Sequence, residues 1–150
     1  RSPLHLAAKS GHEGAVRLLL DKNADIAARD NAGFSPLHLV ADNGHEGAMR
    51  LLLENNADIA ARSIGGFSPL LCAAMNGDEG VVRLLLENSA DIAARDEAGY
   101  SPLHLAAWKG HEGAVRLLLH RGEEPSTSRR GTKLATHRST RQLEVVMWTR

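Results

Sequence analysis

The stretch "SPLHLAAWKGHEGAVRLLL", residues 101–119, decides the fold, because near copies of it begin at three earlier points of the chain. The four copies start at Ser2, Ser35, Ser68 and Ser101, so that each start lies 33 residues after the one before. A fixed internal period of this length is typical of a repeat protein, in which each unit can bury its apolar face only against its neighbours. The sequence therefore predicts one elongated domain.

Each copy contains the signals for two helices. A Ser-Pro pair opens the first helix, because proline presets the backbone φ of a first helical turn and serine can cap it. A glycine suits the left-handed residue that ends this helix, and it recurs at Gly11, Gly44, Gly77 and Gly110. The second helix buries the equivalents of Val16, Leu19 and Leu20 and is expected to end near Asn23, Asn56, Ser89 and Gly122.

The segments that join one copy to the next share a turn pattern. They read "ADIAARDNAGF", "ADIAARSIGGF" and "ADIAARDEAGY", beginning at residues 24, 57 and 90. Each contains an isoleucine that we expect to be buried (Ile26, Ile59, Ile92) and a glycine-bearing turn suited to a tight, hairpin-like connection. The predicted unit is helix, turn, helix, hairpin loop.

This combination of period and motifs resembles the ankyrin repeat family, whose signature is Thr-Pro-Leu-His-x-Ala, with serine here where threonine is usual. The resemblance covers residues 1–122, divided into repeats of about 1–29, 30–62, 63–95 and 96–122, the first one truncated. It implies an all-α ankyrin-repeat solenoid of stacked helix-turn-helix units with hairpin loops. It also implies a curved concave surface that binds other proteins, with no chemistry of its own.

Both ends of the array depart from the pattern. The first repeat starts at its Ser-Pro pair, so we expect further repeats before Arg1 in a longer parent. After Gly122 the sequence "EEPSTSRRGTK" replaces the expected loop. Residues 123–150 are either a degenerate fifth repeat or a disordered basic tail, and their Ser, Thr and Arg content favours disorder for residues 123–133.

Composition limits the partners and the compartment. Eighteen basic and eighteen acidic residues leave no net charge, so nothing in the total indicates nucleic acid or an anionic membrane as a partner. Residues 1–120 hold eleven Lys or Arg against fifteen Asp or Glu, and residues 121–150 hold seven against three. The single cysteine, Cys72, excludes an internal disulfide framework and fits a reducing compartment. We expect an intracellular monomer, cytoplasmic rather than nuclear, with a protein partner.

Candidate catalytic and metal-binding residues do not form a site in this pattern. Six of the eight histidines fall in two registers: His5, His38, His104 and His12, His45, His111. A zinc site needs ligands that converge on one point, whereas equal positions in stacked units are spaced along the stack. The ankyrin resemblance implies instead that the histidine of "PLH" ties the helix start to neighbouring hairpins. Cys72 replaces a leucine and is expected to be a buried small hydrophobe. We therefore predict no enzyme, no cofactor and no metal.

Partner-binding residues are expected where the repeats differ. In the ankyrin family these positions are the hairpin tip and the exposed flank of the first helix. Carried over by register, the predicted contact residues are Phe34, Asp42, Arg62, Ile64, Phe67, Met75, Tyr100, Trp108 and Lys109. Four of the five aromatic residues of the chain belong to this set, and aromatic side chains commonly anchor protein interfaces. Arg62 is chosen as the charge contact because Ser63 follows it, whereas an aspartate follows Arg29 and Arg95.

Two alternatives stay open at this point. The rings of Phe34, Phe67 and Tyr100 could simply lie against the next hairpin and cover the stack. The array as a whole could be a structural spacer, or an intramolecular cover for another part of a larger multidomain signalling protein. The arginines of the second helices, Arg17, Arg50, Arg83 and Arg116, pair with glutamates in sequence and indicate an ordinary solvated face.

Overall fold

A computed structural model describes residues 1–122 of the chain, which form eight α-helices and no β-strand within that range. The helices are α1 (Pro3–Ser10), α2 (Glu13–Asp21), α3 (Pro36–Asn43), α4 (Glu46–Glu54), α5 (Pro69–Asn76), α6 (Glu79–Glu87), α7 (Pro102–Lys109) and α8 (Glu112–Gly122). The predicted all-α architecture is confirmed. The two interpretations of residues 123–150 lie outside the described residues.

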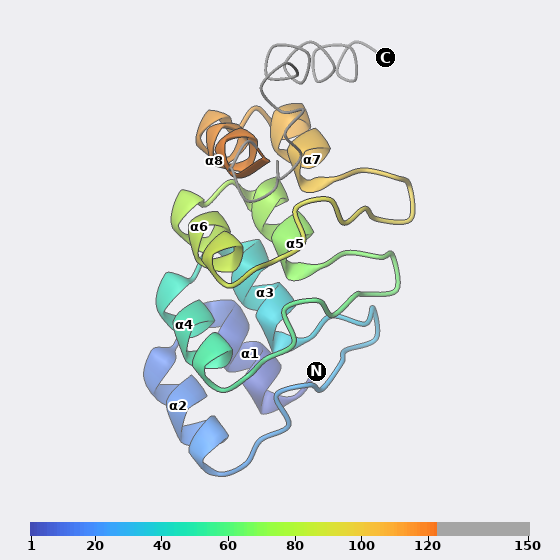
Figure 1. Ribbon diagram of the computed structural model, residues 1–150. Helices are drawn as coiled ribbons and strands as arrows, with labels where there is room; N and C mark the ends of the chain where they lie inside the picture. Colours follow the sequence, from blue (N-terminus) through green and yellow to red (C-terminus); the bar gives the residue numbers. More distant parts are fainter. Residues whose placement is uncertain (123–150) are drawn as a thin grey trace, which may run out of the picture.

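The helices form two rows along a stack (Figure 1). The inner helices α1, α3, α5 and α7 pack in succession against one another, and the outer helices α2, α4, α6 and α8 do the same. The loops between repeats project from one side of the stack as extended hairpins. We call the surface formed by the inner helices and these hairpins the groove face.

The inner helices begin and end where the sequence predicts. In all four, the serine before the proline caps the helix by accepting a hydrogen bond from the backbone N–H three residues later. Each ends at its glycine in the left-handed conformation, with φ between the 71° of Gly44 and the 84° of Gly77. These two signals hold every inner helix to 8 residues.

The outer helices end close to the predicted residues. Asn23 and Asn56, which lie just beyond α2 and α4, have φ of 64°, and Ser89 beyond α6 has φ of 69°. In the fourth repeat α8 ends at Gly122, the last residue that the structure describes. Ser89 therefore occupies a backbone conformation that asparagine and glycine adopt more readily.

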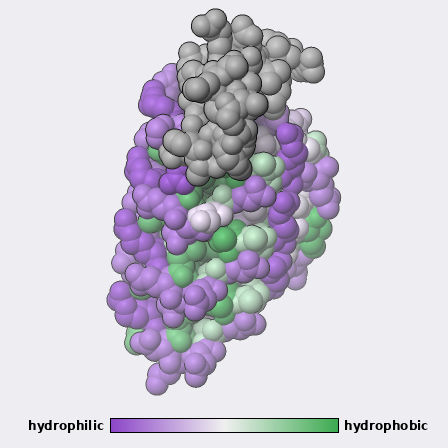
Figure 2. All heavy atoms as spheres, viewed as in Figure 1, coloured by the Kyte–Doolittle hydropathy of each residue, from purple (hydrophilic) through white to green (hydrophobic). Residues whose placement is uncertain are grey.

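The core lies between the two rows of helices. Val16, Met49, Leu52, Val82 and Leu85, from the outer helices, are all completely buried. The loop residues Ile26, Ile59 and Ile92 are half-buried against this core, which corrects the expectation that they are buried. In Figure 2, hydrophobic residues gather in a band along the stack, with hydrophilic residues on either side. No helix of residues 1–122 has both the length and the apolar character needed to cross a membrane.

Candidate functional site

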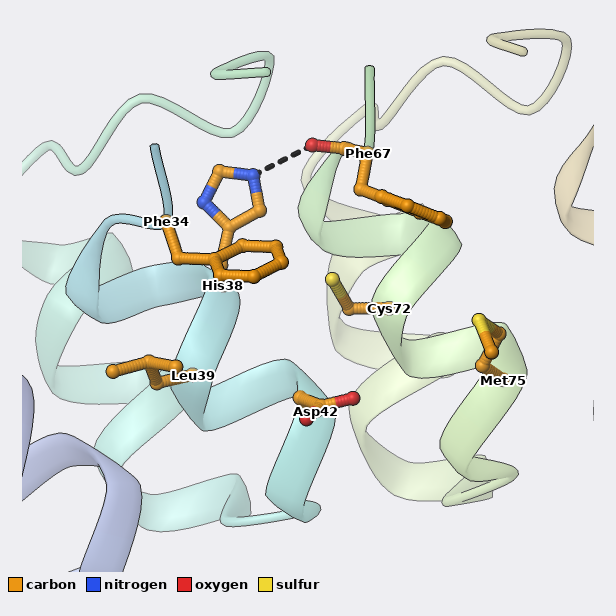
Figure 3. A pocket seen from close by; sticks show the side chains of 7 residues that line it. All are labelled: Phe34, His38, Leu39, Asp42, Phe67, Cys72 and Met75. Atoms are coloured by element: carbon orange, nitrogen blue, oxygen red, sulfur yellow. Dashed lines mark hydrogen bonds between the residues drawn. The ribbon is translucent and has the colours of Figure 1, made fainter. Parts of the chain in front are cut away.

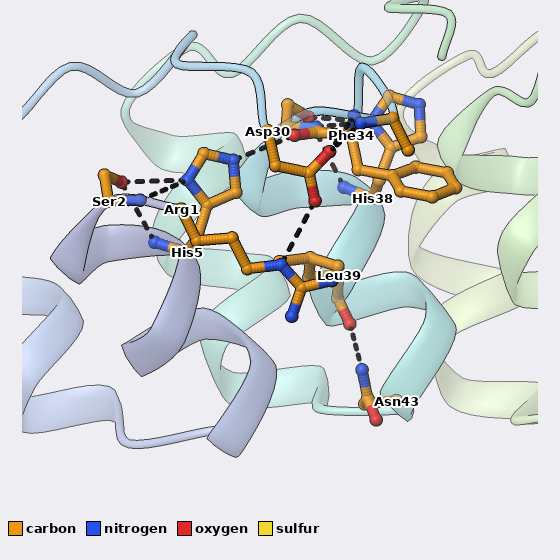
Figure 4. Close-up of polar contacts among 10 residues, drawn as sticks. Arg1, Ser2, His5, Asp30, Phe34, His38, Leu39 and Asn43 are labelled. Atoms are coloured by element: carbon orange, nitrogen blue, oxygen red, sulfur yellow. Dashed lines mark hydrogen bonds and ion pairs between the residues drawn. The ribbon is translucent and has the colours of Figure 1, made fainter. Parts of the chain in front are cut away.

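Histidines of the "PLH" motif connect α1 and α3 to the hairpin that follows each of them (Figure 3 and Figure 4). The ring Nδ1 of His38 accepts a hydrogen bond from the Ser35 N–H at 3.0 Å, so the ring proton is on Nε2. Nε2 then donates to the carbonyl oxygen of Phe67 at 2.7 Å. His5 forms the same bridge to the carbonyl oxygen of Phe34 at 2.8 Å. The structural role that the sequence resemblance implied for these histidines is confirmed.

Burial decides the protonation of His38. Its side chain is fully buried, and burial lowers the pKa of its imidazole. The hydrogen bond to the carbonyl of Phe67 opposes this shift, while the charge of Arg29 adds to it. His38 is thus held as a neutral ring whose two nitrogens are both in use.

A second set of histidines connects repeats in the opposite direction. His45 Nε2 donates to the carbonyl oxygen of Lys9 at 2.8 Å, and His111 Nε2 donates to that of Met75 at 2.9 Å. In repeat three the position is Asp78, which caps α6 by accepting from the Val81 N–H at 3.0 Å. This connecting role was not predicted, although the regular spacing of these histidines in the sequence was the signal for it.

Arginines at the hairpin bases form a third set of connections. Arg62 Nη1 donates to the carbonyl oxygens of Gly66 at 2.9 Å and Arg95 at 2.7 Å. Arg29 makes the equivalent pair of hydrogen bonds, to Gly33 at 3.2 Å and to Arg62 at 2.8 Å. Arg29 and Arg62 thus make the same hydrogen bonds, although Asp30 follows the first and Ser63 the second. Arg62 is exposed, and its role as a partner contact stays a prediction.

The predicted apolar contacts fall into two groups by exposure. Phe34 and Phe67 are half-buried and pack against the core, as the covering alternative expects. Ile64, Tyr100 and Trp108 are exposed by 68%, 50% and 73%. Lys109 Nζ lies 4.9 Å from the ring centroid of Trp108, within cation–π range. Among the predicted contacts, the exposed large apolar side chains thus lie in the third and fourth repeats.

A pocket of about 230 Å³ opens on the groove face between α3 and α5 (Figure 3). It contains four of the predicted contact residues, namely Phe34, Asp42, Phe67 and Met75. Its wall is completed by three residues that the sequence analysis did not select as contacts: His38, Leu39 and Cys72. The other predicted contacts, Arg62, Ile64, Tyr100, Trp108 and Lys109, do not line it.

A family model described as ankyrin repeats (3 copies) matches residues 1–63 and again residues 61–129. The chain belongs to the ankyrin repeat family. Ankyrin repeats are generally protein-binding modules and are generally non-catalytic. A comparison with curated proteins gave no match.

The inner helices of this ankyrin array present one position whose chemistry changes in every repeat. Lys9, Asp42, Met75 and Trp108 are separated by 33 residues each, so they occupy the same place on α1, α3, α5 and α7. A cation, an anion, a thioether and an indole follow one another along the groove face.

The two ionisable groups of the pocket differ in their surroundings. The Asp42 residue as a whole is exposed to solvent, but protein atoms surround part of its carboxyl group. This partial burial raises the pKa of the Asp42 carboxyl, and the positive charge of Lys9 opposes the rise. Burial, with a smaller contribution from the charge of Asp42, raises the pKa of the Cys72 thiol to about 12. The thiol is therefore protonated at neutral pH, and it forms part of the apolar wall of the pocket. It is not a nucleophile in this state, because the nucleophilic species is the thiolate.

Among the residues that the structure describes, no group of three or more His, Cys, Asp or Glu side chains is placed to hold a metal ion.

Proposed function

We propose that this ankyrin array is a non-catalytic protein-binding module that holds a partner on its groove face. The observation that carries the proposal is the exposure of Ile64, Tyr100 and Trp108. They are three of the five large hydrophobic residues that are exposed within residues 1–122. Aromatic side chains presented to solvent on a preformed scaffold are the residue type that most often anchors protein interfaces.

The hydrogen bonds between repeats support this function by fixing the groove face before binding. His38, Arg29 and Arg62 each bond to the following repeat, and His45 bonds to the preceding one. A preformed surface loses less conformational freedom on association, so more of the contact energy appears as affinity. The hairpins and inner helices are thereby held as one binding surface.

The proposal includes the absence of catalysis and an intracellular location. His5 and His38 use both ring nitrogens in structural hydrogen bonds, so neither ring is available as a general base. The free thiol of Cys72 is protonated and buried, and a free thiol is compatible with a reducing compartment. We propose that the protein acts as a monomer on a protein partner.

The test compares two matched quadruple variants of the full chain. The groove variant changes Ile64, Met75, Tyr100 and Trp108 to alanine, and leaves Phe34 and Phe67 in place because they pack against the core. The control variant changes the exposed outer-helix residues Arg17, Arg50, Arg83 and Arg116 to alanine. Each protein is immobilised after its helicity has been checked by circular dichroism, and proteins captured from cell extract are identified by mass spectrometry.

Proteins that bind the parent and the control variant but not the groove variant are the expected result. Capture lists that are the same for the parent and the groove variant would place binding elsewhere. Empty lists for all three would favour the structural alternative, in which the array is a spacer or an intramolecular cover.

A further inference from the structure

We propose that the pocket between α3 and α5 receives one large apolar side chain of a partner peptide, and that a lysine or arginine beside that side chain pairs with Asp42. The proposal rests on the protein-binding function above and narrows it to one subsite with a defined occupant. Figure 3 shows the wall residues and places Asp42 at the α3 edge of the hollow.

The hollow lies over a single irregular residue of the repeat. Cys72 stands in the register that Leu39 and Leu105 fill in the neighbouring repeats, and all three are at most 5% exposed. Cysteine has a shorter side chain than leucine, so a volume that leucine would fill is left open. The sequence of repeat three thus creates the pocket at this step of the stack.

The walls of the pocket are suited to an apolar occupant. Phe34, Phe67, Leu39 and Met75 offer rings, a branched chain and a thioether, and the Cys72 thiol is protonated. His38 adds no free hydrogen-bonding group, because both of its ring nitrogens are bonded to the backbone. The volume of about 230 Å³ is below the roughly 300–1,000 Å³ of typical small-molecule sites and fits one side chain.

The charge of Asp42 indicates which residue of the partner peptide lies beside that apolar side chain. The ion pair found within residues 1–122 joins Arg1 and Asp30, and no described residue forms one with Asp42. Lys9 influences the Asp42 carboxyl through its charge without bonding to it. Residues 1–120 as a whole carry eleven basic and fifteen acidic residues. A cation of the partner is therefore complementary to this edge of the pocket, and an anion is not.

The experiment selects peptides on the full chain and then tests them on single variants. A phage-displayed library of random 12-residue peptides is selected on the immobilised parent protein. Enriched peptides are synthesised, and their Kd values are measured by fluorescence polarisation. We expect the enriched peptides to share a Leu, Met, Phe or Trp next to, or one residue away from, a Lys or Arg.

Cys72→Leu is the decisive variant, because it restores the residue of the other repeats and fills the hollow. We expect it to raise the Kd of the selected peptides at least tenfold, as loss of an interface anchor does. Its matched control, Cys72→Ala, keeps the hollow open and is expected to change Kd by less than about twofold. A thermal melt checks that Cys72→Leu is folded. Met75→Lys, which places a competing cation at the rim, gives an independent loss of at least tenfold by the same argument.

Asp42→Asn tests the charged part of the proposal. Loss of a largely exposed ion pair is expected to weaken binding about two- to fivefold. The difference between parent and Asp42→Asn should shrink as salt is raised, because salt screens exposed charges. Glu54→Gln removes an exposed acid from α4 of the same repeat and is expected to leave Kd unchanged.

Peptides that bind Cys72→Leu and Met75→Lys as tightly as the parent would overturn the proposal, as would a selection that enriches none. If such peptides lose affinity for Trp108→Ala or Tyr100→Ala instead, the protein-binding function stands and the pocket is not its site. Peptides that respond to Cys72→Leu but not to Asp42→Asn would overturn the assignment of the cation.

Discussion

At the scale of single residues, His38 combines two structural tasks in one side chain. It completes the N-terminal cap of α3 with Ser35 and holds the hairpin of the next repeat through the carbonyl of Phe67. Replacing it with leucine, the residue that repeat three carries at this register as Leu71, leaves the buried Ser35 N–H without its partner. It also removes one of the two hydrogen bonds that the Phe67 carbonyl accepts, the other coming from the Ser63 N–H. His38→Leu is therefore expected to lower the free energy of unfolding by about 1–3 kcal/mol in urea titrations.

His12→Leu is the control for this substitution. His12 is exposed, and its side chain forms no cap on α2. Its replacement is expected to change stability by less than about 0.5 kcal/mol. Equal losses for the two variants would mean that the bridge to Phe67 contributes nothing.

The same histidine predicts a dependence of stability on pH. Burial lowers the pKa of His38 in the folded protein below the 6.5 of an exposed imidazole, with the charges of Arg29 and Asp30 acting in opposite directions. The unfolded chain therefore binds a proton more readily than the folded one, and folding stability must fall as pH drops below about 6.5. Above that pH the contribution is complete. Urea titrations at about pH 7.5 and pH 5.5 should show a larger loss for the parent than for His38→Leu. The same loss in both would assign the pH dependence to other groups.

At the scale of helices, the ends of the outer helices differ by a single residue. Ser89 has φ of 69° at a position where Asn23 and Asn56 have φ of 64°. Asparagine tolerates the left-handed region better than serine does. Ser89→Asn is expected to raise the free energy of unfolding by about 0.5–1 kcal/mol, and the reverse change Asn56→Ser to lower it by a similar amount. Chemical denaturation of both variants checks the pair, and changes of the same sign would contradict it.

Contacts between repeats also determine at which helical glycines a larger residue can be accommodated. A Cβ built on Gly14 of α2 meets no atom within 4 Å, whereas one on Gly47 of α4 would collide with the carboxylate of Glu13. Gly14→Ala is expected to raise the free energy of unfolding by about 0.5–1 kcal/mol through helix propensity. Gly47→Ala should gain less, because the Glu13 side chain must move. Denaturation of Gly47→Ala in a Glu13→Ala background should recover the gain, and failure to recover it would show that Glu13 is not the obstacle.

At the scale of the whole molecule, the stack could be predicted from the sequence, but the site only in part. The Ser-Pro pairs and glycines act within a few residues, so they set the bounds of α1, α3, α5 and α7 in the sequence itself. The pocket depends on whether the neighbours of Cys72 close over its shorter side chain, which is a matter of three-dimensional packing. The connections of Arg62 and His45 likewise depend on which carbonyl of an adjacent repeat lies within reach. Residue type singled out the aromatic side chains as candidates, but only the packed repeats separate half-buried Phe34 from exposed Trp108.

Because each repeat packs only against its neighbours, local stability should vary along the stack. Among the residues of α2, Val16 is the one that is buried, whereas α4 and α6 each bury four, including Met49 and Val82. Leu18 of α2 is 65% exposed. Native-state hydrogen exchange should therefore find the amides of α2 less protected than those of α4 and α6.

The substitution Met49→Ala separates fraying of one helix from opening of the whole stack. Removing this buried side chain is expected to cost about 2–5 kcal/mol. If repeats two and three open together, the variant lowers protection in α6 as well as in α4. Exchange in α2 then changes little, because its amides already exchange through a local opening that does not require the centre to unfold. Equal protection of α2 and α4 in the parent, falling equally in the variant, would mean instead that the four repeats open as one unit. In that case the connections made by His5 and His45 would hold the first repeat to the centre more strongly than its buried surface suggests.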